Sequence, residues 1–378
     1  MSDAGDIPEP DRQPGASHPR ETAALFGQEE AESAFLDACN AGRLHHAWLI
    51  SGPRGVGKAT LAWRIARFLL ATPDTKDGLF GVPEPPRTLD IDPNNPVARR
   101  VAALSEPRLF LLRRPWDSKA RRLRAEITVD EARRLKGFFA LSSTDGGRRV
   151  VIVDSADELN PSAANAVLKL LEEPPARTVL LLVSHQPSRL LATIRSRCRT
   201  LRCRTLGVDD MQGALSAAGL DLPEGAGPLA ALSGGSVGEA YMLTSEGGLE
   251  FYAALVSLVG RAPGINRPAM LQFVERYGAR GEAIGIERAL HIADLFLSRL
   301  ARTGVAGPPL PEATPGEAAL LQRLCPDACA ARYWAGVQQR QGARVRQGIS
   351  VNLDPAALLL DTVLTIDAGA GQAAPAPA

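Results

Sequence analysis

The chain has 378 residues, which is longer than one typical domain, and a composition of 45% hydrophobic and 22% charged residues excludes a fibrous or wholly disordered protein. Its 43 Lys and Arg nearly balance 42 Asp and Glu, so any contact with nucleic acid must come from a local patch. The polar N-terminus does not resemble a signal peptide, no apolar run is long enough to span a membrane, and the five cysteines form no Cys-x-x-Cys pair. We therefore expect a cytoplasmic protein with no membrane partner.

The first part of the chain predicts an α/β domain. Residues 1–19 are polar and proline-rich and predict a disordered leader. Between residues 20 and 205, the short apolar runs AWLISG, RRVVIVDS and TVLLLVSH alternate with helical patterns, which is typical of a parallel sheet covered by helices. Within this domain, the stretch 71–125 begins with many Pro, Asp and Gly residues and predicts a surface insertion.

The second part of the chain predicts helices, because the strand patterns stop after residue 205. Residues 206–245 read as a small helical domain, and residues 246–366 as a separate all-helical domain of longer amphipathic helices. The closing run 367–378 is of low complexity and predicts a disordered tail.

A glycine-rich phosphate loop follows the first predicted strand, with the sequence Gly-Pro-Arg-Gly-Val-Gly-Lys-Ala-Thr from Gly52 to Thr60. Such a loop wraps its backbone amides around phosphate oxygens, and Lys58 would reach the outer phosphates. The residue after the lysine normally holds Mg²⁺ through a hydroxyl, but it is Ala59 here, and Thr60 lies about 100° farther around the helix. A strand-to-helix turn kept only for packing is the alternative.

A second acidic motif ends the strand VVIVD at Asp154, which is typical of a Walker B strand. In hydrolytic members of this class the next residue is a Glu that activates water, whereas this chain has Ser155. Asp157 or Glu158 could replace it only from a displaced position, and otherwise both read as solvated carboxylates beside a helix N-terminus. That helix is predicted to begin with Asn160 as its N-cap. The candidate nucleotide-binding residues are Gly52, Gly55, Gly57, Lys58, Ala59, Thr60 and Asp154.

Taken together, several motifs resemble the clamp-loader branch of the AAA+ proteins. They include His46-Ala47, GPRGVGK, VDSADELN, LLEEPP, the segment from Val183 to Cys198, and LSGGSVGEA, and their order and spacing fit over residues 20–245. The pairing of LLEEPP with Ser196-Arg197-Cys198 is more specific than the phosphate loop. The resemblance implies an AAA+ P-loop domain (20–205), a helical lid (206–245) and a helical collar (246–366) through which subunits oligomerise.

The resemblance also implies roles for single residues. Arg197 corresponds to an arginine finger that is offered in trans to ATP on a neighbouring subunit. His185 stands at the position that senses the γ-phosphate, and Gly238 replaces the arginine of the lid. With Ala59 and Ser155, these departures imply intrinsic ATPase activity that is absent or very weak, weak binding of ATP or ADP, and Mg²⁺ only if nucleotide binds.

Metal sites are not expected. Relatives often carry a four-cysteine zinc module after the P-loop helix, but residues 71–125 contain no cysteine, so we expect no zinc. Cys325 and Cys329 read as small packed side chains. The basic run 113–124 contains Trp116 and reads as a solvated connector or subunit contact, or alternatively as a contact to a phosphate backbone.

The resemblance implies a subunit of the bacterial DNA polymerase III clamp loader, without a polymerase site of its own. Its partners would be the other loader subunits, the sliding clamp and primed DNA. Two alternatives stay open. One is an ATP-hydrolysing motor subunit of the same loader, and the other is a small-molecule P-loop kinase, for which nothing after Leu170 is needed.

Overall fold

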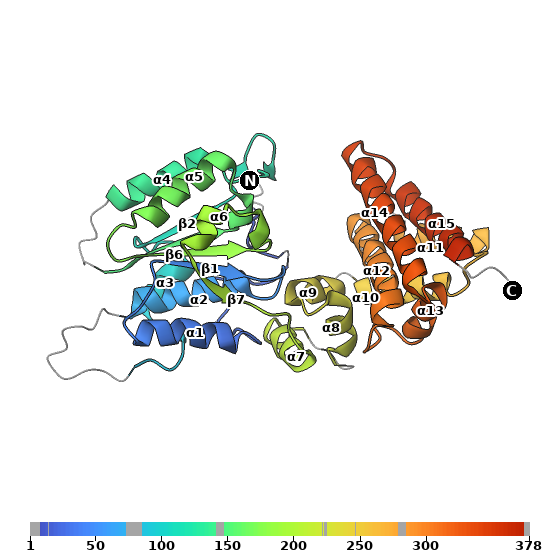
Figure 1. The fold of residues 1–378 in the computed structure, drawn as a ribbon, viewed down its shortest axis with the longest axis horizontal. Coiled ribbons are helices and arrows are strands. Elements are labelled where there is room, and N and C mark those ends of the chain that lie inside the picture. The colour runs from blue at the N-terminus through green and yellow to red at the C-terminus, as the bar shows by residue number, and fades with distance from the viewer. Residues whose placement is uncertain are drawn as a thin grey trace, which may run out of the picture. The chain divides into compact units, whose positions relative to one another are not determined.

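The computed structural model describes residues 8–13, 15–72, 85–140, 147–220, 222, 225–245, 247–278 and 285–373. The chain forms two compact units (Figure 1). The first comprises Met1–Leu220 with Ser236–Gly238, and the second comprises Asp221–Gly235 with Glu239–Ala378. The predicted division into P-loop domain, lid and collar stays a prediction.

The first unit is built on a parallel sheet of five strands. In spatial order they are β2 (Leu109–Arg113), β5 (Arg149–Asp154), β6 (Thr178–Ser184), β1 (Ala47–Ser51) and β7 (Arg199–Arg202). The three central strands are buried almost throughout, as expected for strands that helices cover on both faces. The predicted α/β fold is therefore confirmed.

The helices of the first unit follow the strands in alternation. They are α1 (Glu29–Asn40), α2 (Lys58–Ala71), α3 (Pro96–Ala102), α4 (Val129–Ala140), α5 (Pro161–Glu172), α6 (Ala192–Ser196) and α7 (Val208–Ala217). The predicted start of α5 is confirmed, because the side chain of Asn160 accepts a hydrogen bond from the backbone N–H of Ala163 at 2.8 Å. A short hairpin, β3 (Trp116–Asp117) with β4 (Arg122–Leu123), follows β2.

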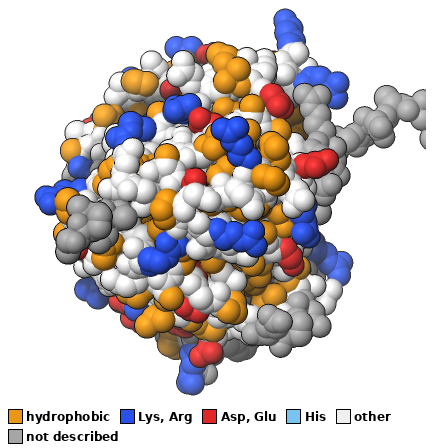
Figure 2. Space-filling model, turned by 90° about the vertical axis from the view of Figure 1, so that its right-hand side faces the viewer, with side chains coloured by type: hydrophobic (Ala, Val, Ile, Leu, Met, Phe, Trp, Pro, Cys, Tyr) orange, Lys and Arg blue, Asp and Glu red, His pale blue; other side chains and the backbone are white. Residues whose placement is uncertain are grey.

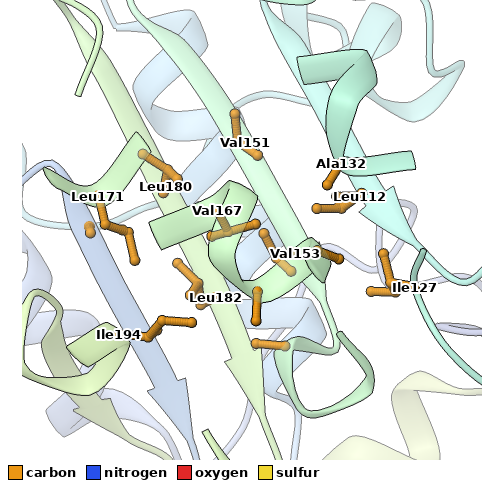
Figure 3. Close-up of a cluster of buried hydrophobic side chains, with 14 of the residues drawn as sticks. Leu112, Ile127, Ala132, Val151, Val153, Val167, Leu171, Leu180, Leu182 and Ile194 are labelled. Carbon is orange, nitrogen blue, oxygen red and sulfur yellow. The ribbon is translucent and has the colours of Figure 1, made fainter. Parts of the chain in front are cut away.

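One face of this sheet packs against α4, α5 and α6. Val151, Val153, Leu180 and Leu182 point from β5 and β6 toward Val167 of α5 (Figure 3). These side chains are fully buried, and the cluster continues to Leu112, Ile127, Leu171 and Ile194. This close-packed core fixes the positions of the strand ends, where the candidate site lies.

The second unit is helical, with no strand among its described residues. Its helices are α8 (Gly227–Ser233), α9 (Val237–Ser245, which begins in the first unit), α10 (Gly248–Val259), α11 (Arg267–Gly278), α12 (Ile286–Ala306), α13 (Glu317–Leu324), α14 (Ala328–Ser350) and α15 (Pro355–Ala373). The long helices α12 and α14 pack together, and α15 contacts α11, α12 and α14. None of the helices that the structure describes is long and apolar enough to cross a membrane.

Three predicted boundaries are wrong. The stretch 71–125 is not an insertion throughout, because it contains α3 and the sheet strand β2, although its residues 73–84 lie outside the described part of the chain. The tail predicted from residue 367 starts inside α15, which buries Ile366 and Ala370 and continues to Ala373. The leader predicted to be disordered is folded from Pro8 onward, apart from Pro14, which is not described, and it buries His18 completely.

Candidate functional site

The candidate site lies where the carboxyl ends of β1, β5 and β6 meet. The P-loop follows β1, Asp154 ends β5, and Ser184 ends β6. Gly52 starts the loop at φ 153°, where an added Cβ would lie 2.4 Å from the backbone oxygen of Cys203. Only glycine fits this close approach, so the sequence Gly-x-x-Gly-x-Gly fixes the path of the loop before α2 begins at Lys58.

Lys58 turns back onto its own loop. Its side chain is buried, and Nζ donates a hydrogen bond to the backbone oxygen of Pro53. Burial lowers the pKa of Lys58 to about 8, even though the nearby carboxylates of Asp154 and Asp157 oppose this shift. Lys58 thus follows the glycine-rich loop, as the sequence predicts, but its ammonium group donates one hydrogen bond to the backbone oxygen of Pro53.

The Mg²⁺ position is incomplete. Ala59 is the second residue of α2 and has no oxygen on its side chain, and Thr60 is the third, rotated about 100° from it. Asp154 is buried, and burial raises its pKa to about 7, with the negative charges of Asp11 and Glu158 adding to the effect. Burial thus favours the protonated form of this carboxyl group while no cation is bound.

The two carboxylates that could replace the missing catalytic Glu are engaged elsewhere. Asp157 accepts hydrogen bonds from Ser184 Oγ at 2.7 Å and from the backbone N–H of His185 at 2.5 Å. Glu158 forms an ion pair with Arg114 at 2.8 Å. Ser155 itself is buried and has no carboxylate, so the geometry provides no evident general base for ATP hydrolysis.

His185 follows β6 at the predicted sensor position. Burial lowers its pKa to about 4, and the positive charges of Lys58 and Arg54 add to this effect. The ring is therefore neutral at physiological pH. It could exchange a hydrogen bond with a phosphate but would not attract the phosphate by charge.

Residues Ser236–Gly238, which belong to the first unit, contact the P-loop. The N–H of Gly238 donates to the backbone oxygen of Gly55 at 3.1 Å, and a Cβ added at Gly55 would lie 2.1 Å from Ser236 Oγ. A Cβ added at Gly238 would approach Gly55 Cα to 3.3 Å, which is tight. Gly238 thus permits a contact that a larger side chain would hinder.

An ion-pair cluster that the sequence analysis missed lies beside Asp154. Arg113, at the end of β2, pairs with Asp11 at 2.5 Å and with Glu9 at 2.7 Å. His18 lies 3.2 Å from Asp11, and Arg20 pairs with Glu9 at 2.8 Å. The one sequence signal is a short run with two acids and a histidine, which is equally typical of a solvated tail.

This cluster affects the charge of the site. The side chain of Asp11 is fully buried and its pKa is lowered, because hydrogen bonding and charge from His18 and Arg113 outweigh the opposing effect of burial. The lowered pKa favours a negative charge on Asp11, next to the Walker B position. The described residues around the P-loop therefore lack two groups that a complex of Mg²⁺ and ATP normally uses, the hydroxyl at position 59 and the carboxylate at position 155.

Arg197 lies away from this site, at the C-terminal end of α6. Its side chain is 37% exposed, pairs with Glu172 at 2.9 Å and donates to the backbone oxygen of Thr193 at 3.1 Å. The strand β7 begins two residues later, and in its parallel pairing with β1, Arg199 lies opposite Trp48 while Arg202 lies opposite Ser51. Arg197 is therefore at the amino edge of the sheet, and the P-loop is at the carboxyl edge.

The basic run 113–124 is partly engaged within the first unit. Arg113 joins the ion-pair cluster, Arg114 pairs with Glu158, and Arg124 pairs with Asp117 at 3.5 Å. Lys119, Arg121 and Arg122 are exposed around the β3–β4 hairpin. Among the residues that the structure describes, no group of three or more His, Cys, Asp or Glu is placed to hold a metal ion.

Comparison with known proteins shows what part of the first unit is similar to. A family model described as DNA polymerase III, delta subunit, matches residues 27–207. Over 212 residues the chain is 39% identical to DNA polymerase III subunit delta' of Pseudomonas aeruginosa, which covers 56% of this chain and 59% of that protein. Over 198 residues it is 30% identical to the gamma/tau subunit of Mycobacterium tuberculosis strain H37Rv, covering 52% of this chain and 31% of that subunit. The match therefore spans less than two thirds of either relative.

The structural similarity is weaker. A solved gamma-subunit-related protein of Thermotoga maritima aligns over 89% of this chain and 99% of its own, at 15% identity and a TM-score of 0.34.

Proposed function

Because residues 27–207 match a family model described as DNA polymerase III, delta subunit, and the chain is 39% identical to a delta' subunit over 212 residues, we propose that this chain is a delta-prime-like clamp-loader subunit that completes the ATP site of a neighbouring subunit with Arg197. The observation that carries the proposal is the position of Arg197, exposed at the edge of the sheet opposite the chain's own P-loop. This edge is opposite the one that carries the chain's own phosphate loop, and the partly exposed guanidinium is open to approach by a neighbouring subunit.

The chemistry of such an arginine is electrostatic. Transfer of the γ-phosphoryl group of ATP spreads negative charge over its oxygens, and a fixed guanidinium stabilises that charge. Supplied in trans, an arginine finger accelerates hydrolysis by about 10³ to 10⁵-fold. Glu172 and the carbonyl of Thr193 hold the Arg197 side chain on the surface, and a phosphate with more charge than one carboxylate would displace Glu172.

The chain's own P-loop is proposed to bind ATP or ADP weakly and not to hydrolyse ATP. When bound, nucleotide with Mg²⁺ would supply the phosphates that a P-loop holds. In this chain Ala59 lacks the Mg²⁺ hydroxyl, Ser155 lacks the water-activating carboxylate, and Lys58 donates to Pro53. These three features support a site that has lost turnover.

The helical unit is proposed to join the other loader subunits. It exposes apolar side chains, including Val305 of α12 at 78% and Leu310, in the connection between α12 and α13, at 81% exposure. Apolar and basic side chains are intermingled over one face of the molecule (Figure 2), a mixture that suits contact with other protein chains. The assembled loader would use ATP in the cytoplasm to open the sliding clamp and close it on primed DNA.

The alternative functions have less support. A motor subunit needs a base, but Asp157 and Glu158 are engaged by the end of β6 and by Arg114. A small-molecule P-loop kinase needs nothing after Leu170, whereas the family match continues to residue 207.

The test is single-turnover ATP hydrolysis by the loader reconstituted with Arg197→Ala. The amount of ATP hydrolysed in the fast phase should fall by the share of one ATP site, because one neighbouring subunit loses its arginine finger. Arg195→Ala is the matched control, because Arg195 is the nearest exposed arginine on α6 and donates only a long bond of 3.4 Å to Pro187. If the loader hydrolyses as much ATP in the fast phase with Arg197→Ala as with Arg195→Ala, Arg197 is not the arginine finger.

A further inference from the structure

Residues 9–13 cross the mouth of the chain's own P-loop. At one end, Asp11 is bound to Arg113, which lies opposite Asp154 in the pairing of β2 with β5. At the other end, Gln13 Oε1 lies 4.0 Å from the position that a Cβ on Gly238 would take, and Gly238 touches Gly55 of the P-loop. Asp11 and Gln13 are two residues apart, a span of at most about 7 Å. The chain between them therefore passes between the Walker B strand and the P-loop tip.

This crossing is anchored by buried contacts. His18 is fully buried, lies edge-on to Trp63 of α2 at 5.8 Å, and contacts both Asp11 and Glu9. Arg67, one helical turn farther along α2, donates to the backbone oxygens of Arg20 at 2.7 Å and Thr22 at 3.0 Å. The helix that follows the P-loop therefore also holds the segment that covers the P-loop.

We infer that residues 9–13 are a built-in occupant of the P-loop site and exclude nucleoside di- and triphosphates from it. Two features make the segment a competitor of a polyphosphate. It crosses the opening that the phosphates must enter, and it brings the carboxylates of Glu9 and Asp11 beside Asp154, where a polyanion would be repelled. It also pairs with Arg113, which lies opposite Asp154 in the sheet and could otherwise attract a phosphate.

The inference rests on the proposal that the chain's own site binds nucleotide weakly, and it gives a cause for that weakness. Loss of the Mg²⁺ hydroxyl at Ala59 would weaken a site permanently. An occupying segment would instead weaken it reversibly, because the segment can be displaced or removed while the glycine-rich loop and Lys58 remain. A change at Asp11 should therefore raise the affinity for nucleotide if the occupying segment is the cause, but not if the loss of the hydroxyl at Ala59 is the cause.

The experiment measures binding of fluorescently labelled ADP, with Mg²⁺, to the full-length chain. Asp11→Asn keeps the shape of the side chain but removes its charge and leaves Glu9 as the carboxylate partner of Arg113, so affinity should rise by about tenfold or more. A variant lacking residues 2–13 should bind at least as tightly and serves if Asp11→Asn fails to fold. Glu21→Gln is the control, because Glu21 is an exposed carboxylate of the same region that pairs with Arg20 at 3.6 Å, and its affinity should equal wild type.

The outcomes separate this inference from the proposal on which it rests. Weak binding by wild type with tighter binding by either variant supports both. Weak binding by wild type that neither folded variant improves overturns the inference and leaves a permanently weakened site. Tight binding by wild type overturns both.

Discussion

Arg197 and Lys58 lie at opposite edges of one parallel sheet. The arginine proposed to act on a neighbouring subunit is therefore separated from the chain's own P-loop. Trp48 and Ser51 of β1 mark the two edges, because they pair with Arg199 and Arg202 of β7. Three residues of strand span about 10 Å, and the P-loop lies beyond Ser51. Two sites on one rigid sheet can thus be changed independently, since mutations this far apart are usually additive.

Gly52 lies so close to the backbone oxygen of Cys203 that one added methyl group should lower the stability of the fold. Gly52→Ala should lower the free energy of unfolding by about 2 to 4 kcal/mol, because the new Cβ would meet the backbone oxygen of Cys203 and cannot rotate away. Gly137→Ala should instead raise it by about 0.5 to 1 kcal/mol, since Gly137 is exposed inside α4 with open space around it. Urea unfolding compares the two, and equal effects would contradict the described path of the loop.

A buried charge pair holds the helical unit together. Glu317 is fully buried and accepts hydrogen bonds from Arg299 Nε at 2.7 Å and from the hydroxyl of Tyr252 at 2.5 Å. Glu317→Ala should cost about 3 to 5 kcal/mol, because it leaves a buried guanidinium without its carboxylate. Glu250→Gln, at an exposed position of α10, should change the free energy of unfolding by no more than about 0.5 kcal/mol. A small loss in both variants would mean that Arg299 finds another partner.

The pair of Glu239 and His291 predicts a pH dependence in the same unit. Their 3.1 Å contact raises the pKa of His291 above its usual value, chiefly through the hydrogen bond to Glu239 and against the opposing effect of burial. A raised pKa means that the protonated ring stabilises the fold below the usual histidine pKa, and that this contribution is lost as pH rises through the raised value. Because His291 is half exposed, the contribution should not exceed about 1 kcal/mol.

Unfolding free energies at pH 5.5 and pH 8.5 test this prediction. Glu239→Gln should reduce the loss of stability between the two pH values, since the amide no longer favours the charged ring. An unchanged difference between the two pH values in this variant would show that other groups cause the dependence.

The sequence predicts the parts of this fold that local signals determine. The end of β5 at Asp154, the N-cap Asn160 and the P-loop are all short-range patterns, and the structure has each of them where it was predicted. The strand β2 was missed because its LFLLR pattern lies in a stretch rich in proline and charge. A strand of five residues gives too weak a periodic signal to outweigh its surroundings.

The N-terminal segment was missed for a different reason. Asp11 and Glu9 find their partner in Arg113, about a hundred residues along the chain. One sequence shows the charges but not which of them meet, and acidic, proline-rich termini are usually solvated. The candidate site was therefore predicted in its P-loop and Asp154, but without the segment that lies across it.

The most direct test of the proposed division of labour compares Lys58→Ala with Arg197→Ala in the same reconstituted loader, with sliding clamp and primed DNA present. The measured quantity is the clamp-stimulated rate of ATP hydrolysis, and the chain alone serves as the baseline. Arg197→Ala should lower the rate, Lys58→Ala should leave it near wild type, and the chain alone should be inactive. A large loss with Lys58→Ala, or robust hydrolysis by the chain alone, would contradict the proposal and identify this chain as a motor subunit.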